Sequence, residues 1–425
     1  MGNSVNKTLP APSGPYIVGA LDVITEHTQQ GCFFRLFYPS QIDEESNSTA
    51  EYTPWVARSK YIDGYGYFSK YFPLSVFRKI FQYTIGDAVV PAKWMQPCCS
   101  LEGTCSDAKY PLIIFSHGLG GNRLVYSAVC SELASHGYIV AAIEHRDGSA
   151  SYTYYHELSE SSDENEIYKE KDLFYETYEP KADVFEYRNS QLKKRVEECI
   201  KVKNYLITKD TLEHLTELQN LKSHIDPTRI VAVGHSFGGA SVIGSLALDS
   251  DFSAGIVLDG WMFPVDKEAE DEVQQPLLFV NNEKFQWKEN VERMQNVISK
   301  FPSGRMMYTI KGSVHQSHAD FTHLADPWLG GFFKVRGSID PQLCHEINSK
   351  MCLHFLQKYL GINLLLSSVK VLLKNYYRTF YKRADRNRHT CKIWRMGNQR
   401  QPTFINIAFI RKLYNVLLFG FAEVD

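Results

Sequence analysis

The chain has 425 residues, of which 44% are hydrophobic, 13% aromatic and 22% charged. This composition is typical of a globular protein and excludes a disordered, collagen-like or coiled-coil chain. Because 46 Lys and Arg residues nearly balance 48 Asp and Glu residues, no overall field attracts nucleic acid, and we expect no nucleic-acid partner.

The amino terminus resembles a lipidation signal. Removal of Met1 would expose Gly2, and the next residues resemble an N-myristoylation sequence, except that Asn6 stands where Ser or Thr is typical. A flexible arm over residues 1–12 explains the same segment without acylation. No secretory signal is recognisable, so we expect a cytoplasmic protein. One acyl chain would give it only reversible membrane association.

Residues 65–85 interleave eight aromatic side chains with three cationic ones. Such a mixture is typical of a membrane interface, with Phe72, Phe77 and Phe81 as candidate contacts, and predicts peripheral binding to a membrane surface. A core helix whose polar edge carries the cations explains the same pattern. The sequence leaves both interpretations open.

An α/β sheet with helices on both faces is predicted from residue 110 onward, preceded by a β-hairpin. Apolar runs without alternating polarity, typical of covered parallel strands, occupy residues 111–115, 138–143, 229–233, 254–258, 276–280 and 306–310. Helical spacing between them, as in residues 124–135 and 187–208, indicates alternating β and α units. Upstream, β-rich runs at residues 16–24 and 32–38 predict the hairpin.

Two charged segments depart from this pattern. Residues 157–180 carry nine acidic and two basic side chains, which predicts a solvated loop or, alternatively, a lid over the site. Residues 361–425 carry 12 basic and three acidic side chains, a net charge of +9. Arg411 and Lys412 interrupt the most apolar window of this tail, so we expect no membrane-spanning helix.

The strongest functional signal is Gly234-His235-Ser236-Phe237-Gly238, a G-x-S-x-G motif between a predicted strand and a predicted helix. A serine on so tight a turn needs neighbours without side chains, and Gly234 and Gly238 meet that need. We therefore predict that the Ser236 hydroxyl is an exposed nucleophile near a helix N-terminus. His235 is too close to act on its neighbour, and we interpret it as a packing residue.

A catalytic serine needs a carboxylate and a base, which follow it in that order in this motif's usual context. Asp259 lies 23 residues after Ser236 at the carboxyl end of a predicted strand, where active-site groups collect in open α/β sheets. Asp266 and Asp271 are rivals in a polar loop. The sequence therefore favours Asp259.

The base is sought among three histidines near the end of the predicted sheet. His315 lies in the segment Lys311–Gln316, just after the apolar run 306–310, so a late loop can bring it over the serine. His318 and His323 lie in a segment that resembles the start of a helix, and we expect them to be solvated or to face the substrate. We therefore prefer His315 as the general base and acid.

An oxyanion hole needs two backbone N–H donors. Phe237, the residue after the nucleophile, is the first. The second should lie in Ser116-His117-Gly118-Leu119-Gly120-Gly121, which follows the strand predicted at 111–115 and is similar to the glycine-rich loop of lipases. A simple glycine turn is the alternative.

Five motifs in order resemble the platelet-activating-factor acetylhydrolases of the group VII phospholipase A2 type, most of all the intracellular type II branch. They are Phe115–Gly120, Glu144–Asp147, Gly234–Gly239, Leu258–Pro264 and Gly312–Gln316. The resemblance implies a calcium-independent α/β-hydrolase that removes sn-2 acetyl or short, oxidised acyl groups from phospholipids with Ser236, Asp259 and His315. It also implies Leu119 as the second oxyanion donor and supports myristoylation of Gly2.

We therefore expect a single α/β-hydrolase domain over residues 13–361 that acts on a phospholipid substrate as a monomer. Residues 362–425 form a divergent basic tail, either a membrane-binding addition or an artefact of gene modelling. A serine esterase, thioesterase or lipid transacetylase on the same fold is the alternative function, followed by an inactive lipid-binding protein. The chain lacks H-E-x-x-H, C-x-x-C and Cys/His ligand spacings, so we expect no metal, no other cofactor and no disulfide framework.

Overall fold

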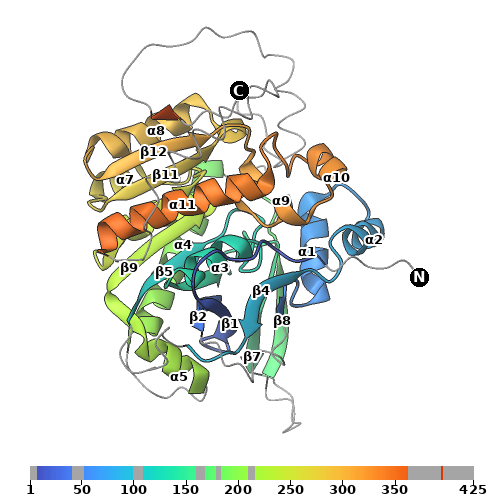
Figure 1. Ribbon diagram of the computed structural model, residues 1–425. Helices are drawn as coiled ribbons and strands as arrows, with labels where there is room; N and C mark the ends of the chain where they lie inside the picture. The colour runs from blue at the N-terminus through green and yellow to red at the C-terminus, as the bar shows by residue number, and fades with distance from the viewer. Residues whose placement is uncertain are drawn as a thin grey trace, which may run out of the picture.

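The computed structural model describes residues 7–40, 52–98, 109–158, 168–178, 183–208, 216–361 and 394–395. Its centre is an 11-stranded sheet with the strand order β13-β12-β11-β10-β9-β5-β6-β2-β1-β4-β3 (Figure 1). The parallel core of this sheet consists of β5 (Tyr110–Ser116), β6 (Ile139–Glu144), β9 (Ile225–His235), β10 (Phe252–Leu258), β11 (Leu277–Asn282) and β12 (Arg305–Ile310). All six strands lie at the predicted runs, which confirms the mostly parallel sheet.

The edges of the sheet contain antiparallel additions. The predicted N-terminal hairpin is present as β1 (Ile17–Ile24) and β2 (Phe33–Ser40), and β2 pairs antiparallel with β6. Beyond β1 lie β4 (Val89–Trp94) and β3 (Tyr52–Pro54), and the two-residue β13 (Trp394–Arg395) pairs with β12 at the other edge. A separate pair, β7 (Tyr152–Leu158) and β8 (Tyr168–Phe174), lies outside the sheet.

Helices cover both faces of the sheet. One face packs against α3 (Ser127–Ser135) and α11 (Pro341–Leu360), which crosses the near side in Figure 1. The other face packs against α4 (Val184–Ile207), α6 (Phe237–Leu248) and α8 (Lys288–Ser299). Successive β5 side chains alternate between these two cores, because neighbouring strand residues point to opposite faces. Both faces are therefore dry, which explains why the strands are continuously apolar.

The remaining elements are short. They are α1 (Ser59–Ser69), α2 (Leu74–Thr84), α5 (Thr216–Ser223), α7 (Lys267–Glu272), η1 (Glu283–Phe285), η2 (His315–His318), α9 (Phe321–Leu324) and α10 (Pro327–Phe332). Local signals explain the ends of the longest helices. Asp183 caps α4 by accepting from the N–H of Glu186, and α11 starts at Pro341 and ends before Gly361, whose φ is 65°.

Two expectations from the sequence were wrong in part. The acidic segment 157–180 was expected to be a loop, but β8 occupies residues 168–174. The strand forms because its partner β7 supplies backbone hydrogen bonds, and the pattern of charged residues gives no indication of these bonds. The expected flexible arm includes Leu9, which is buried and whose backbone N–H donates to the carbonyl of Val89. The segment that contains Leu9 is thus hydrogen-bonded to β4 of the central sheet, whereas Gly2 lies outside the described residues.

Several predictions can be compared with the described residues directly. Six of the nine cysteines are described, and all six are buried thiols without a disulfide. No helix in the described ranges combines the length and the apolarity needed to cross a bilayer. The tail at 362–425 lies outside the described residues apart from β13, so its role stays open.

Candidate active site

Ser236 occupies a strained turn between β9 and α6. Its φ of 57° and ψ of −115° lie where residues with a side chain rarely occur. The two motif glycines make the turn possible: a Cβ on Gly234 would lie 2.1 Å from the carbonyl oxygen of Gly238, and one on Gly238 would lie 1.9 Å from that of Ser116. The turn therefore places the hydroxyl at the N-terminus of α6, as the motif predicts.

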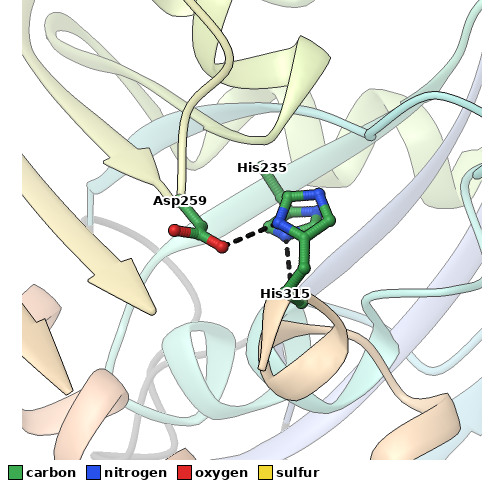
Figure 2. A group of neighbouring side chains, drawn as sticks. All are labelled: His235, Asp259 and His315. Atoms are coloured by element: carbon green, nitrogen blue, oxygen red, sulfur yellow. Dashed lines mark hydrogen bonds and ion pairs between the residues drawn. The ribbon is translucent and has the colours of Figure 1, made fainter. Parts of the chain in front are cut away.

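Asp259 and His315 form a hydrogen-bonded pair beside this turn. Asp259 directly follows β10 and is fully buried, and its Oδ2 accepts from Nδ1 of His315 at 2.7 Å (Figure 2). The carboxylate accepts three further hydrogen bonds: from the N–H of Asn282 at 2.8 Å, from Asn282 Nδ2 at 3.2 Å and from Gln286 Nε2 at 3.1 Å. These donors hold the carboxylate in the orientation in which it meets the imidazole.

Burial determines the protonation of this pair. It lowers the pKa of His315 to about 3, so the imidazole is neutral near pH 7 and able to accept a proton. Burial also raises the pKa of Asp259 to about 7, against the opposing effect of the donors from Asn282 and Gln286. Because the two groups share one hydrogen bond, they titrate as a unit. The pair is therefore competent as a base only above the pH at which it takes up a proton.

Ser236, His315 and Leu119 line one cavity of about 380 Å³. The cavity walls are mainly apolar side chains: Phe68, Phe72, Phe77, Ile80, Phe81, Val125, Phe321, Phe333 and Val335. A few polar groups interrupt these walls, among them Lys70, Thr177, Arg188, Gln316 and Asp326. An apolar cavity with a few convergent polar groups is typical of a small-molecule or lipid site.

The backbone around Leu119 is held from behind by groups that the sequence did not single out. The carbonyl of Gly118 accepts from Nδ1 of His117 at 2.7 Å and from the N–H of Gly121 at 3.0 Å. This carbonyl belongs to the same planar peptide as the N–H of Leu119, so fixing the carbonyl also fixes the direction of the N–H. The buried Arg195 donates to the carbonyl of His117 at 2.6 Å.

Arg195 also connects the two predicted oxyanion donors. Its guanidinium lies 4.3 Å from the ring centroid of Phe237, the residue after the nucleophile, and pairs with Asp147 at 3.0 Å. Phe237 itself is fully buried, so its side chain belongs to the core. In the sequence, only the helical spacing of α4 indicates that Arg195 points inward. Its role could not be predicted, because the residues that it contacts come from distant segments of the chain.

His235 connects three parts of the site. It is buried, accepts from the hydroxyl of Tyr126 through Nδ1 at 2.8 Å, and donates through Nε2 to the carbonyl of His315 at 3.0 Å. The same hydroxyl accepts from the N–H of Gly118 at 3.1 Å. His235 therefore does more than fill space: it holds the loop of His315 against the turn of Ser236.

Three side chains of the site have the composition of a metal centre. His235, Asp259 and His315, which Figure 2 shows side by side, each offer a ligand atom. These atoms lie within 4.8 Å of one another. Their hydrogen bonds argue for a different use. Both nitrogens of His235 are engaged with Tyr126 and the His315 backbone, and Nδ1 of His315 donates to the carboxylate. A cation held by all three side chains would have to displace at least one of the two hydrogen bonds of His235.

Asp320 anchors the loop that carries His315. Its buried carboxylate accepts from Trp55 Nε1 at 2.8 Å and from the N–H groups of Ser127 and Ala128 at 2.8 and 3.0 Å, at the start of α3. Burial raises the pKa of Asp320 to about 8. Because Asp320 lies only five residues after His315, it ties the position of the base to α3.

The rival residues lie elsewhere. Asp266 is partly exposed and accepts from Asn189, and Asp271 is exposed and pairs with Lys300. The expectation that His318 is solvated was wrong: it is buried near the Asp259 pair, because η2 turns it inward beside His235. His323 is half-buried in α9 and packs edge-on against His345.

The aromatic segment 65–85 forms part of the cavity wall. The prediction of Phe81 as a membrane contact was wrong, since it is only 4% exposed and stacks on Trp55. Phe72 and Phe77 are half-buried and line the cavity. The most exposed aromatic side chains nearby are Tyr83 at 92% and Trp328 at 76%. Helical periodicity explains the difference, because it turns Phe81 inward and Tyr83 outward.

The sheet order, the turn at Ser236 and the covering helices are those of an α/β-hydrolase. The ferulic acid esterase from Streptomyces cinnamoneus has the same fold, with a TM-score of 0.57 and 18% identity over 86% of this chain and 98% of that one. The family model of platelet-activating factor acetylhydrolase, isoform II, matches residues 1–369, and the chain belongs to this family.

Two curated relatives illustrate the similarity. The platelet-activating factor acetylhydrolase of Canis lupus familiaris is 40% identical over 362 residues, which cover 83% of this chain and 78% of the relative. The enzyme of the same name from Gallus gallus is 40% identical over 371 residues, covering 83% of this chain and 84% of the relative. Each match therefore covers more than four fifths of this chain.

Proposed function

We propose that the protein is a hydrolase that removes the sn-2 acetyl or short acyl group from platelet-activating factor and related phospholipids. One observation carries the proposal: in a member of this family, His315, which is hydrogen-bonded to Asp259, lines the same apolar cavity as the strained Ser236. Independence from calcium follows from the family resemblance. The substrate is a phospholipid, and the products are a lysophospholipid and a carboxylate.

Acylation begins when the Ser236 oxygen attacks the sn-2 carbonyl carbon and His315 takes the hydroxyl proton. Asp259 holds the imidazole through its Nδ1–H and stabilises the positive charge that forms on it. The backbone N–H groups of Leu119 and Phe237 stabilise the oxyanion, each worth about 3 kcal/mol of barrier. The bond to glycerol then breaks, and His315 gives its proton to the departing lysophospholipid oxygen.

Deacylation repeats these steps with water. His315 takes a proton from the water as its oxygen attacks the ester on Ser236, and the same two N–H groups stabilise the second oxyanion. Collapse of this intermediate returns the proton to the Ser236 oxygen and releases the carboxylate. The neutral state of His315, which its burial favours, is required at the start of both halves.

The protein would meet lipid at the rim of this cavity. A second, almost wholly apolar hollow beside it is lined by Phe72, Lys79, Ile80, Tyr83, Thr84, Trp328 and Phe333, four of which also line the catalytic cavity. Exposed aromatic side chains with a flanking cation are typical of membrane interfaces. We propose that this surface binds the membrane reversibly, with or without an acyl chain on Gly2.

Vesicle co-sedimentation tests the membrane surface. Replacing Tyr83 and Trp328 together with Ser should weaken binding to phosphatidylcholine vesicles, because both side chains are exposed next to the cavity. Leu248→Ser is the matched control, since Leu248 is 70% exposed at the end of α6. Equal binding by the double variant and the control would contradict the proposed surface.

The activity itself is tested by acetate release from 1-alkyl-2-acetylglycerophosphocholine in the presence of a calcium chelator. The wild type should be active, and Ser236→Ala should lose at least about 10³-fold in kcat, as expected when a nucleophile is removed. Ser299→Ala, an exposed serine at the end of α8, is the control. An inactive wild type, or an active Ser236→Ala, would refute the proposal.

A further inference from the structure

We propose that Arg188 binds the phosphate of the phospholipid substrate, an inference that rests on the proposed function. Arg188 belongs to the first turns of α4 and lines the same cavity as Ser236, although the residue is only 5% exposed. Its guanidinium donates to Oε1 of Gln191 at 2.8 Å and to the hydroxyl of Tyr175 at 3.1 Å. Both partners are neutral, and no ion pair to Arg188 occurs among the described side chains.

The other buried arginines of the described chain are compensated in one of two ways. Arg35, Arg123 and Arg195 each pair with a buried or half-buried carboxylate. Arg146 and Arg305 each donate to three backbone carbonyl oxygens. A buried cation without such compensation costs stability. Arg188 is thus the buried arginine whose charge is best available to a ligand.

Position along α4 brings Arg188 close to the reacting centre. Arg188 and Arg195 are seven residues apart, so they share a helix face and lie about 10 Å apart along its axis. Arg195 contacts the oxyanion loop through the carbonyl of His117. Arg188 therefore lies on the same face of α4 as Arg195, two turns closer to the N-terminus of the helix.

Side-chain packing connects Arg188 to the oxyanion loop. Tyr175, whose hydroxyl accepts from Arg188, packs its ring edge-on against Phe68 with centroids 4.8 Å apart. Phe68 in turn lies against Gly120, since a Cβ there would come within 2.3 Å of the ring. In a glycerophospholipid only the ester oxygen and one end of the glycerol separate the sn-2 carbonyl from the phosphodiester. A lipid whose carbonyl lies at Leu119 can therefore place its phosphate near Arg188.

The chemistry of the side chain fits a phosphodiester. A guanidinium presents paired N–H groups that match two phosphate oxygens, and this match is strongest where water is excluded. Gln191 and Tyr175 orient the guanidinium without neutralising it. Arg188 would thus select esters that carry a phosphate over neutral esters with the same acyl group.

The test compares Arg188→Gln with the wild type on two substrates that share the sn-2 acetyl group: 1-alkyl-2-acetylglycerophosphocholine and the neutral 1-alkyl-2-acetylglycerol. The ratio of kcat/KM for the phospholipid to that for the neutral lipid should fall about 10- to 100-fold, the value expected for losing a charge-assisted hydrogen bond. Arg188→Lys should restore part of this ratio. Lys193→Gln, an exposed cation on the same helix, should leave it at the wild-type value.

Three outcomes would overturn the assignment. Equal loss on both lipids would show a structural role, and an unchanged ratio would show no contact with the phosphate. Inhibition of neutral-lipid hydrolysis by inorganic phosphate that Arg188→Gln abolishes, combined with an unchanged ratio for the two lipids, would assign the site to free phosphate instead of the lipid. Failure of the proposed function looks different, because the wild type would then cleave neither acetyl lipid.

Discussion

Gln286 donates one of the four hydrogen bonds that the Asp259 carboxylate accepts, and we predict that its removal moves the pH dependence of activity. Gln286→Met keeps the length of the side chain and removes the donor. A carboxylate with one donor fewer is easier to protonate, so the pKa of Asp259 should rise further from its already raised value of about 7. Activity should then be lost at a higher pH than in the wild type.

The size of the shift follows from the bond that is lost. A hydrogen bond to a charged group contributes about 1.5–3 kcal/mol, and one pKa unit corresponds to 1.36 kcal/mol, which gives about one to two units as an upper range. Gln286 is partly buried and its bond is 3.1 Å long, so we expect the lower end, about one unit. In the wild type, kcat/KM should fall as pH drops through about 7, where the pair takes up a proton.

The assay is the pH profile of kcat/KM on a neutral acetyl ester between about pH 5 and 9, because this ratio reports pKa values of the free enzyme. Well above the transition, Gln286→Met should approach wild-type activity. Gln342→Met, an exposed position on α11, is the matched control. A lower plateau with an unshifted midpoint would refute the reasoning, because it would show that Gln286 does not act through the carboxylate.

Three further substitutions test the framework of the site. Asp320→Ala leaves three buried N–H donors without an acceptor and should lower the free energy of unfolding by roughly 3 kcal/mol or more, measured by urea denaturation. Gly238→Ala should give no folded protein by circular dichroism, because its Cβ would lie 1.9 Å from the carbonyl oxygen of Ser116. His235→Phe removes the bond to the carbonyl of His315 and should lower kcat about tenfold in a folded protein; unchanged kcat would exclude a positioning role.

Hydrophobic patterns and local motifs in the sequence predict much of the fold. The six parallel strands could be predicted because strands buried on both faces are continuously apolar, and the hairpin of β1 and β2 because its two runs are separated by a short polar segment. Strand β8 could not be predicted. It owes its conformation to pairing with β7, and its own residues Tyr168–Phe174 are too charged to indicate a strand.

The positions of Ser236, Asp259 and His315 could be predicted because Ser236 and Asp259 directly follow strands of the parallel sheet and His315 lies five residues after another. The carboxyl ends of such strands meet at one edge. The groups that support them could not. Gln286 lies in the loop after β11, and Arg195 and Arg188 lie on α4, far from the motif in sequence. Polar side chains of this kind have no pattern of their own on a helix or loop.

The sequence by itself determined the order of the serine, carboxylate and histidine along the chain, the tight turn at Ser236 and the apolar character of both sheet faces. These features depend on steric limits and on hydrophobic spacing within short segments. Only the tertiary structure decided which polar groups compensate one another. Arg195 has a carboxylate partner and Arg188 has none among the described residues, although both lie on the same face of α4. That difference depends on which distant segments fold against each turn of the helix, since electrostatic compensation is a property of neighbours in space.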